Sequence, residues 1–513
     1  MADTQSLWTD TGPPRPGDKL ANLKKLDVCI VGGGIAGLMT AYELLREGRS
    51  VTVLDSKAEF GGGETAYTSA HLSSIIDDGF ARVEAVRGLD VSKLAYASHS
   101  DAITLIEDIA QREGIDCDFT RVDGFLFVAD GRDPQTLEEE EAAAIRARVI
   151  TERMNKVPCK HFHTGACLRF QSQARFHPLK FMAGLAKAVK GNGGRILTNV
   201  NVTGITGGPM VTVTADGDRE IQANQVVVAT NSPVHNVIGL HTKMAAYTSY
   251  VIAADIPPKT VRDALLWDTQ DPYHFVRIQP ADKPGGPDLL IVGGEDHKTG
   301  QADDQDVRWA RLEEWARKHN PDIGKVQYRW SGQVFETLDG LAFIGPDSGG
   351  AENVYVVTGD SGMGLTHAGV AARLLTDLML GRKSDLADVY SPTRYPVRAA
   401  GTYVGENLNV ALQYADWVTG GDVADASEIK PGCGAVIRKG LTKHAVYRDD
   451  AGTLHEMTAV CPHMKGIVRW NAGEKTWDCP CHGSRFTAEG EVAHGPSTMG
   501  LKQIEVKEPA GAK

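Results

Sequence analysis

The chain has 513 residues, more than one hydrophobic core usually serves, so roughly two to four domains are expected. Apolar residues make up 42% of the chain and charged residues 23%, which excludes a disordered or fibrous protein. The formal net charge of −12 argues against nucleic acid or an anionic membrane surface as a partner.

Residues 1–25 are polar and proline-rich, and they predict an extended N-terminal arm with Trp8 packed onto the body. The arm has neither the apolar core of a secretory signal nor a twin-arginine pair. No apolar run in the chain approaches the ~20 residues that a membrane-spanning helix needs. The eight cysteines are scattered rather than arranged as a secreted disulfide framework, so we expect a cytoplasmic protein.

A strand–helix–strand unit follows the arm. Residues 26–31 (LDVCIV) predict a buried strand, residues 35–47 a helix, and VTVLD, which ends at Asp55, a second strand. Residues 80–160 are mainly helical in pattern, with one strand at FLFVA. The acidic run Glu138–Glu141 within them is expected to be a solvated helix face.

The second half of the chain is richer in strands. Short strands are predicted within residues 195–230, and the alternation over residues 245–295 predicts an antiparallel sheet. Residues 354–380 predict a strand, a glycine-rich turn and a helix. A linker with one helix is expected over residues 386–425, followed by short, glycine-rich strands.

The first motif lies in the early strand–helix turn. Gly32-Gly33-Gly34-Ile35-Ala36-Gly37 fits G-x-G-x-x-G, follows a strand and opens a helix. Gly32 allows the tight turn, Gly34 lets the backbone approach a pyrophosphate, and Gly37 lets helix and strand pack closely. Asp55 is placed to accept hydrogen bonds from a ribose. A plain glycine-rich turn is the alternative, but the full context favours a dinucleotide site.

The motif alone does not separate NAD from FAD, but residues 26–72 resemble the start of the D-amino-acid-oxidase-like family of FAD proteins. Three later segments are also similar to that family: Gly61–Thr65, VVVATNS, and DGLAFIGP followed by VTGDSGMGLTHA. The resemblance covers residues 26–385 in patches and implies FAD as cofactor. The FAD contacts that it implies are Gly32, Gly34, Ile35, Ala36, Gly37, Asp55, Ser56, Gly62, Gly63, Thr65, Thr68, His71, Leu72, Val202, Ala229, Thr230, Gly332, Gly359, Ser361, Gly362, Met363, Gly364 and Leu365.

The resemblance also implies how the flavin is held. The loop from Gly359 to Gly364 would bring backbone N–H groups and a helix N-terminus near the flavin C2 carbonyl, where they stabilise the reduced ring. Family members that bind flavin covalently carry a histidine close to a tryptophan in the first flavin segment. Thr68 stands at the corresponding place here, with His71 three residues later. We therefore expect non-covalent FAD, with His71 only lining the site.

A second motif lies near the C-terminal end. Cys461-Pro-His463 is followed, after fifteen residues, by Cys479-Pro-Cys481-His482. Two Cys/His pairs at such spacing form two loops that clasp a metal centre, and Cys2His2 is also a zinc combination. Zinc fingers usually pair cysteine with cysteine, whereas each loop here supplies one cysteine and one histidine. That is the Rieske arrangement, in which two thiolates hold one iron and two imidazoles hold the other.

The surrounding sequence also resembles Rieske domains, over residues 426–505. The resemblance implies a [2Fe-2S] cluster held by Cys461, His463, Cys479 and His482. Respiratory members carry a disulfide from the position of Cys481 to that of Gly466, so Cys481 is expected to be a free thiol.

Two further positions bear on the cluster. Ser484 stands where a hydroxyl bonds a bridging sulfide. Phe486 replaces the tyrosine of high-potential members, which predicts a potential below the top of the ~−150 to +300 mV Rieske range.

Candidate substrate contacts come from the predicted antiparallel sheet and the flavin loop. Arg277 is a candidate clamp for a substrate carboxylate, although pairing with a nearby acid is an equal alternative. His274 lies near it in sequence, and Asp360 is a candidate base or cation-attracting group, or a turn residue. Weaker candidates are Trp267, Tyr273, Tyr250, Trp330 and His297.

The predicted fold is an α/β FAD-binding Rossmann-like domain with an α+β antiparallel-sheet substrate domain, plus a C-terminal all-β Rieske domain. The FAD-binding domain is assigned to residues 26–80, 170–240 and 335–385, and the substrate or cap domain to residues 81–169 and 241–334. Residues 386–425 are assigned to a linker, and residues 426–505 to the Rieske domain.

The leading functional hypothesis is a dehydrogenase. FAD would oxidise a C–N bond of a small amine or amino acid, and electrons would pass singly to the cluster and to an external carrier. The alternatives are reverse flow from cluster to flavin, and a redox-sensing or electron-carrier module without a dedicated small substrate. A closed pocket with one cationic group over the flavin would favour the enzyme. A Rieske oxygenase is excluded because the chain lacks a convincing motif for a mononuclear iron.

Overall fold

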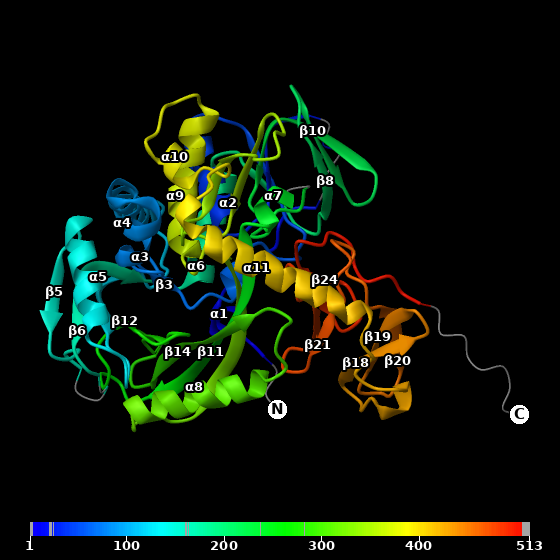
Figure 1. Cartoon of the computed structure of the whole chain (residues 1–513). Coiled ribbons are helices and arrows are strands. Elements are labelled where there is room, and N and C mark those ends of the chain that lie inside the picture. Colours follow the sequence, from blue (N-terminus) through cyan, green and yellow to red (C-terminus); the bar gives the residue numbers. More distant parts are fainter. Residues whose placement is uncertain are drawn as a thin grey trace, which may run out of the picture.

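The computed structural model describes residues 4–19, 23, 25–159, 162, 164–235, 238–281 and 283–504. Figure 1 shows three parts: a parallel sheet with helices at the top, a large curved sheet below it, and a small β-rich part to one side. Helix α11 (Ala400–Gln413) runs from the body to the β-rich part. Within the described residues, no helix is long and apolar enough to cross a membrane.

The parallel sheet has the order β16-β17-β10-β1-β2-β7. Its strands read as continuous apolar runs because both faces are covered, and Val28, Ile30 and Val53 are fully buried. The strands are β1 (Lys25–Val31), β2 (Val51–Leu54), β7 (Arg195–Leu197), β10 (Arg219–Val228), β16 (Phe343–Pro346) and β17 (Val354–Thr358), with β8 (Val202–Thr206) and β9 (Val211–Ala215) extending it. The helices of this part are α2 (Ile35–Arg46), α6 (Pro178–Gly191), α7 (Ile238–His241), α9 (Gly364–Met379) and α10 (Leu386–Tyr390).

The large sheet has the order β15-β11-β14-β13-β12-β4-β6-β3, and β5 pairs with β6. One face packs on α8 (Gln305–His319) through residues such as Tyr250, Leu290 and Trp309. The other face carries Val251 and Ile291 into the core that it shares with the parallel sheet. The strands are β3 (His71–Leu72), β4 (Thr120–Phe127), β5 (Thr151–Met154), β6 (Cys167–Arg175), β11 (Met244–Ile256), β12 (Ala264–Asp268), β13 (Phe275–Gln279), β14 (Asp288–Lys298) and β15 (Val326–Thr337).

Three helices lie beside this sheet: α3 (Phe80–Arg87), α4 (Leu89–Arg112) and α5 (Gln135–Arg146). The sequence predicts that the whole acidic run on α5 is solvated, but only part of it is. Glu138 and Glu139 are exposed, but Glu140 is buried and accepts hydrogen bonds from the N–H groups of Phe80 and Ala81. Those N–H groups are the unpaired donors at the start of α3, so Glu140 caps a neighbouring helix.

The N-terminal segment is anchored rather than simply extended. It contains the short helix α1 (Leu7–Thr11), capped by Ser6. Trp8 is fully buried, and its indole N–H donates to the Thr68 carbonyl oxygen at 2.6 Å. The predicted packing of Trp8 on the body is therefore confirmed, while the extended arm was wrong for residues 7–11.

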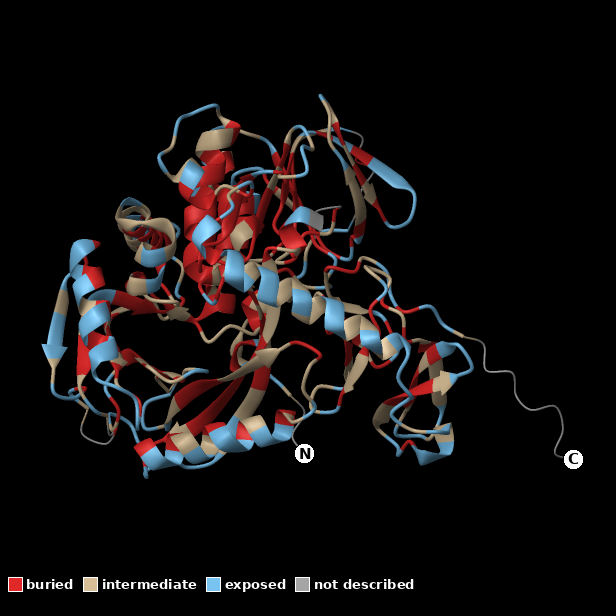
Figure 2. Cartoon of the chain, in the orientation of Figure 1, coloured by how far each residue is buried: buried red, intermediate tan, exposed pale blue. Residues whose placement is uncertain are grey.

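The β-rich part consists of two small antiparallel sheets, β18-β19-β20 and β21-β22-β23-β24. Figure 2 shows that α11, which joins it to the body, carries no buried residue. The strands are β18 (Cys433–Lys439), β19 (Thr442–Arg448), β20 (Leu454–Thr458), β21 (Arg469–Asn471), β22 (Thr476–Asp478), β23 (Arg485–Thr487) and β24 (Val492–His494). The short 3-10 helices of the chain are η1 (Glu64–Ala66), η2 (Val397–Ala399), η3 (Tyr414–Trp417) and η4 (Ala426–Glu428).

Candidate cofactor and substrate sites

The glycine turn after β1 packs tightly at two positions and is open at a third. A Cβ at Gly32 would lie 2.3 Å from the Ala229 carbonyl oxygen, and one at Gly37 would lie 2.0 Å from the Gly32 carbonyl oxygen. At Gly34 a Cβ would meet only the Thr65 hydroxyl, at 3.4 Å. Glycine is thus required for packing at Gly32 and Gly37, whereas Gly34 leaves space for a ligand.

Asp55, at the end of β2, holds this turn. Its carboxylate oxygens accept hydrogen bonds from the N–H groups of Gly33, at 2.7 Å, and Lys57, at 2.8 Å. Burial raises the pKa of Asp55, while the two N–H groups act in the opposite direction. Each carboxylate oxygen keeps a further lone pair, so this bonding is compatible with the predicted ribose contact.

The second glycine segment closes the other side of the space. The Ile35 N–H donates to the Thr65 hydroxyl at 3.2 Å, and the Gly61 N–H donates to the Gly33 carbonyl at 2.9 Å. A Cβ at Gly63 would meet nothing within 4 Å. An open space between two glycine segments, at the N-terminus of α2, fits the phosphates of a dinucleotide.

The flavin loop lies between β17 and α9. Gly359 has a φ of 68°, and the Ser361 hydroxyl accepts a hydrogen bond from the Thr337 N–H at 2.9 Å. Thr230 follows β10 beside Gly32, and Gly332 lies in β15, where a Cβ would come within 3.0 Å of the Tyr67 carbonyl oxygen.

The other predicted FAD contacts lie in varied surroundings. Ala36 and Ile35 start α2, Met363 and Leu365 flank the start of α9, and Ser56 is exposed. Leu72 and Val202 are buried in hydrophobic clusters.

His71 is held by the protein on both ring nitrogens. Nε2 lies 3.1 Å from the Val276 carbonyl oxygen, and Nδ1 lies 3.2 Å from the Ser69 hydroxyl. Burial, with Arg277 nearby, lowers the pKa of His71 to about 3, so the ring is neutral. Both ring nitrogens of His71 thus have partners in the protein, and non-covalent FAD stays a prediction.

Arg277 has a different environment from the clamp that was predicted. Its guanidinium is fully buried and donates to the carbonyl oxygens of Ala70 and Phe176 and to the side chain of Gln279. It also lies over the Trp8 ring, with 5.3 Å to the ring centre. A substrate carboxylate would have to displace these bonds, so Arg277 anchors the N-terminal segment in this structure.

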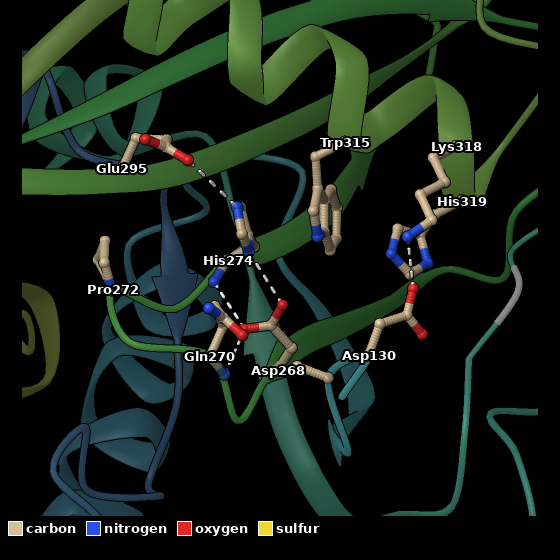
Figure 3. A pocket seen from close by; sticks show the side chains of 10 residues that line it. Asp130, Asp268, Gln270, Pro272, His274, Glu295, Trp315, Lys318 and His319 are labelled. Carbon is tan, nitrogen blue, oxygen red and sulfur yellow. Dashed lines mark hydrogen bonds and ion pairs between the residues drawn. The ribbon is translucent and has the colours of Figure 1, made fainter. Parts of the chain in front are cut away.

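His274 lies on the face of the large sheet that packs on α8. Its Nδ1 is 2.9 Å from Asp268, and its ring stacks on Trp315 at 4.4 Å. Figure 3 shows it lining a pocket of about 230 Å³ with Glu295 and Lys318. Arg277 faces the opposite side, because strand residues alternate between faces. The two predicted substrate contacts are therefore not brought together.

Acidic side chains gather on the face of the large sheet that is turned toward the flavin loop. Glu336 and Trp330 lie an even number of residues apart in β15, so their side chains point to the same face of the sheet. Trp330 packs in the shared core on that face. His297 stacks on Tyr250 on the α8 side, so its neighbour Asp296 points to the other face. Sequence reasoning missed both residues, because neither has a motif around it.

The opposing wall supplies two more carboxyl groups. Asp77 follows β3, and a Cβ at Gly362 would lie 2.7 Å from its Oδ2. Asp360, the third predicted substrate contact, lies in the flavin loop, and its Oδ1 is buried without a hydrogen-bond partner. Burial raises the pKa of Asp77 and of Asp360 to about 7 in each case. This face is thus lined by acids rather than by the single cationic group considered above.

The four predicted cluster ligands form two pairs. Cys461 and Cys479 lie close enough for their thiols to interact, and the rings of His463 and His482 are 5.2 Å apart. Nδ1 of His482 is buried without a hydrogen-bond partner. No group of three or more candidate ligands surrounds a single point in the described residues, as one zinc ion would require. A thiol pair beside an imidazole pair fits a two-iron cluster.

Cys481, Ser484 and Phe486, the three residues predicted to surround the cluster, are all buried. All eight cysteines are free, and a Cβ at Gly466 would lie 2.6 Å from the Cys481 sulfur. Ser484 is fully buried, and its hydroxyl accepts a hydrogen bond from the Ser497 N–H at 3.0 Å. Phe486 is fully buried in β23.

Replacing Gly466 with cysteine is expected to create a disulfide with Cys481. The added Cβ would lie 3.4 Å from the Cys481 Cβ, near the 3.5–4.5 Å that disulfides adopt. Closing a loop of this length stabilises by about 3 kcal/mol. The oxidised variant should therefore keep its visible absorbance to a higher temperature than Gly466→Ser, which has the same bulk and no sulfur. Unchanged thiol counts after oxidation would contradict the prediction.

The cluster loops pack directly on the large sheet. The Gln333 side-chain amide donates to the Gly483 carbonyl oxygen at 2.7 Å, while the Gln333 N–H donates to Glu64 at 2.8 Å. Glu64 lies in the second glycine segment and pairs with His494 of β24 at 2.8 Å. Gln333 thus connects the cluster loop, through its side chain, with Glu64 of the predicted flavin segment, through its backbone N–H.

A third histidine lies beside the cluster ligands. His241, at the end of α7, has its ring 4.9 Å from that of His463 and 6.0 Å from that of His482. It is buried, with 6% of its surface exposed. The sequence offered no signal for it, because an isolated histidine is usually a core or surface residue.

The comparisons with known proteins agree with this geometry. The family described as FAD dependent oxidoreductase matches residues 27–378, and the Rieske [2Fe-2S] domain matches residues 420–505. The protein YhfW of Bacillus subtilis (strain 168), which carries the name of a Rieske 2Fe-2S iron-sulfur protein, is 30% identical over 94% of this chain and 93% of its own. Gamma-glutamylputrescine oxidoreductase of Escherichia coli (strain K12) is 28% identical over 71% of this chain and 86% of its own.

Solved structures share the fold of the body. Glycine oxidase from Geobacillus kaustophilus has a TM-score of 0.60 at 18% identity and covers 72% of this chain and 99% of its own. L-proline dehydrogenase from P. horikoshii has a TM-score of 0.59 at 18% identity and covers 72% of this chain and 98% of its own. The protein binds FAD and a Rieske [2Fe-2S] cluster. The chain belongs to the FAD dependent oxidoreductase family and adds a Rieske [2Fe-2S] domain to it.

Proposed function

We propose that the protein is a dehydrogenase that oxidises the C–N bond of a small amine or amino acid and passes the electrons through its cluster to an external one-electron carrier. The observation that carries this proposal is the packing of the cluster loop on the segments around the predicted flavin site. Gln333 bonds the Gly483 carbonyl with its side chain and Glu64 with its backbone. A redox sensor without a substrate would not need a face lined by ionisable groups beside that site.

The relatives support the reaction class. Gamma-glutamylputrescine oxidoreductase is named for an amine substrate, and it matches most of the body of this chain. The solved glycine oxidase and L-proline dehydrogenase support the fold alone, at 18% identity each. The substrate, its carrier and the direction of electron flow in this chain are our proposals.

The overall reaction removes two electrons and two protons from H–C–N–H of the substrate and leaves an imine, which water hydrolyses. When bound, FAD supplies a two-electron acceptor, and the [2Fe-2S] cluster supplies one-electron transfer. The chain's residues would bind the substrate nitrogen and manage its protons. Oδ1 of Asp360 has no hydrogen-bond partner, and its pKa of about 7, raised by burial, suits accepting a proton from a substrate ammonium group.

Contacts between the two parts would keep the cofactors near one another. A Cβ at Gly300 would lie 2.9 Å from the Pro480 nitrogen, and one at Gly483 would lie 2.4 Å from the Ala246 Cβ. Such close packing at two glycines holds the cluster loop against the sheet. Electrons would leave through the cluster, whose loop contacts the body at these two glycines.

Anaerobic titration with substrate, followed by visible absorbance, tests the proposal. Amines and N-methyl amino acids would be screened under nitrogen. An active compound should bleach the flavin first and then the cluster, before any external acceptor is added. If flavin reduced by a substrate never reduces the cluster, the proposed order of electron transfer is wrong.

A further inference from the structure

Four carboxyl groups lie on the large sheet and on segments beside the predicted flavin loop. Asp296 and Glu336 lie on the inner face of the large sheet, in β14 and β15. Asp77 follows β3, and Asp360 lies in the flavin loop before α9. The four groups influence one another electrostatically. Burial raises the pKa of Glu336, and the negative charges of Asp77, Asp296 and Asp360 raise it further.

None of these four groups forms an ion pair with lysine, arginine or histidine in the described part of the chain. Arg308, which approaches Asp296 from α8, is held by Asp304 at 2.7 Å. Lys298 is held in the same way by Glu406 at 2.5 Å. Burial raises the pKa of Asp296 to about 6, although Ser249, Arg308 and His274 act in the opposite direction.

Unsatisfied polar atoms point to a missing ligand at this place. Ser249 has only 7% of its surface exposed, and its hydroxyl interacts with the Asp296 carboxylate without forming a hydrogen bond of good geometry. Its register opposite Gly332 of β15 places it on the same face as Glu336, beside Asp296. Oδ1 of Asp296 is also buried without a partner. Buried polar atoms are rarely left unpaired, so a hydrogen-bond donor belongs here.

We infer that this acidic cluster, defined by Asp77, Asp296, Glu336 and Asp360, binds a substrate with two or more ammonium groups, a diamine or polyamine. The inference rests on the proposed function and narrows its substrate class. An ammonium group carries charge and donors together, so it satisfies the unpaired oxygens and offsets the repulsion among the acids. A substrate carboxylate would instead meet like charge, and the buried Arg277 is occupied by Ala70, Phe176 and Gln279.

Three four-carbon compounds isolate the effect of charge. The holoenzyme would be titrated with 1,4-diaminobutane, n-butylamine and 4-aminobutanoate, with dissociation constants read from the shift of the oxidised flavin spectrum. Anaerobic bleaching would be recorded in the same samples. We expect the diamine to bind at least about tenfold more tightly than the monoamine, which corresponds to one further buried charge contact. The zwitterion should bind least well.

Variants of the large sheet test which residues hold the second ammonium group. Asp296→Asn and Glu336→Gln are expected to raise the dissociation constant of the diamine by about tenfold or more each, and to change that of n-butylamine by less than about threefold. Glu314→Gln, on the exposed side of α8, is the matched control and should change neither. Both replacements keep the side-chain volume, and FAD content would be measured to confirm an intact site.

The outcomes separate this inference from the proposed reaction. If n-butylamine or 4-aminobutanoate binds as tightly as the diamine, or the two variants leave diamine binding unchanged, the inference is overturned. Bleaching by any of these compounds, or by an amino acid, would still support the dehydrogenase. A diamine that shifts the spectrum but never bleaches the flavin would leave the cation site standing and remove the proposed reaction.

Discussion

Replacing Gly34 with alanine is expected to leave the fold intact and to weaken FAD binding by about 10- to 100-fold, since overpacking costs about 1–3 kcal/mol. In the protein without ligand, the added methyl group would touch only the Thr65 hydroxyl, at 3.4 Å. The φ of Gly34 is −72°, which alanine adopts without strain. The methyl group would project into the space that the pyrophosphate needs. Flavin content of the purified protein and titration of the apoprotein with FAD measure the effect.

A second glycine provides the matched control. Gly191 ends α6, and a Cβ there would meet nothing within 4 Å. Gly191→Ala should therefore keep full FAD content, and its free energy of unfolding should rise slightly, by about 0.4–1 kcal/mol. If Gly34→Ala binds FAD as tightly as the parent protein while remaining folded, the pyrophosphate does not approach this turn, and the assigned dinucleotide site is wrong.

The parts of the site that the sequence predicts are those specified by neighbouring residues. The turn at Gly32, the helix after it and the two Cys/His loops each lie within a short segment whose geometry follows from its own residues. The structure brings Cys461 and Cys479 together, with the two imidazoles beside them. Local chemistry of this kind needs no knowledge of the rest of the fold.

The substrate face depends on strand register, which the sequence does not reveal. Arg277 and His274 lie three residues apart, yet they face opposite sides of the sheet, one toward Trp8 and one toward Trp315. A shift of one residue in a strand reverses its faces, so proximity in sequence says little about proximity in a site.

The acidic cluster was equally hidden from the sequence. Asp77, Asp296 and Glu336 come from different strands and loops, and only the pairing of β11 with β14 and β15 brings two of them to one face. Asp360 was a candidate because it stands next to a recognisable motif. Its predicted ability to attract a cation becomes specific only when the other carboxyl groups are seen around it.

Replacing His482 with alanine is expected to uncouple the two halves of the proposed reaction. The change removes one of the two imidazole ligands. Changes to groups around a metal ligand typically lower metal affinity or activity by about 10–100-fold, and loss of the ligand itself should lower them further. Turnover with a one-electron acceptor should therefore fall by about 100-fold or more. Bleaching of the flavin by substrate under nitrogen should keep its rate, because the acidic cluster and the glycine turns are untouched.

The control for this prediction is another histidine of the same part. His455 pairs with Asp449 at 3.2 Å, at the edge formed by β20, and its replacement with alanine should leave cluster absorbance and turnover unchanged. Acceptor reduction at the parental rate by a His482→Ala protein without cluster would mean that electrons leave the flavin directly. Loss of substrate bleaching together with turnover would mean that the change disturbs the flavin site, and the predicted uncoupling would be wrong.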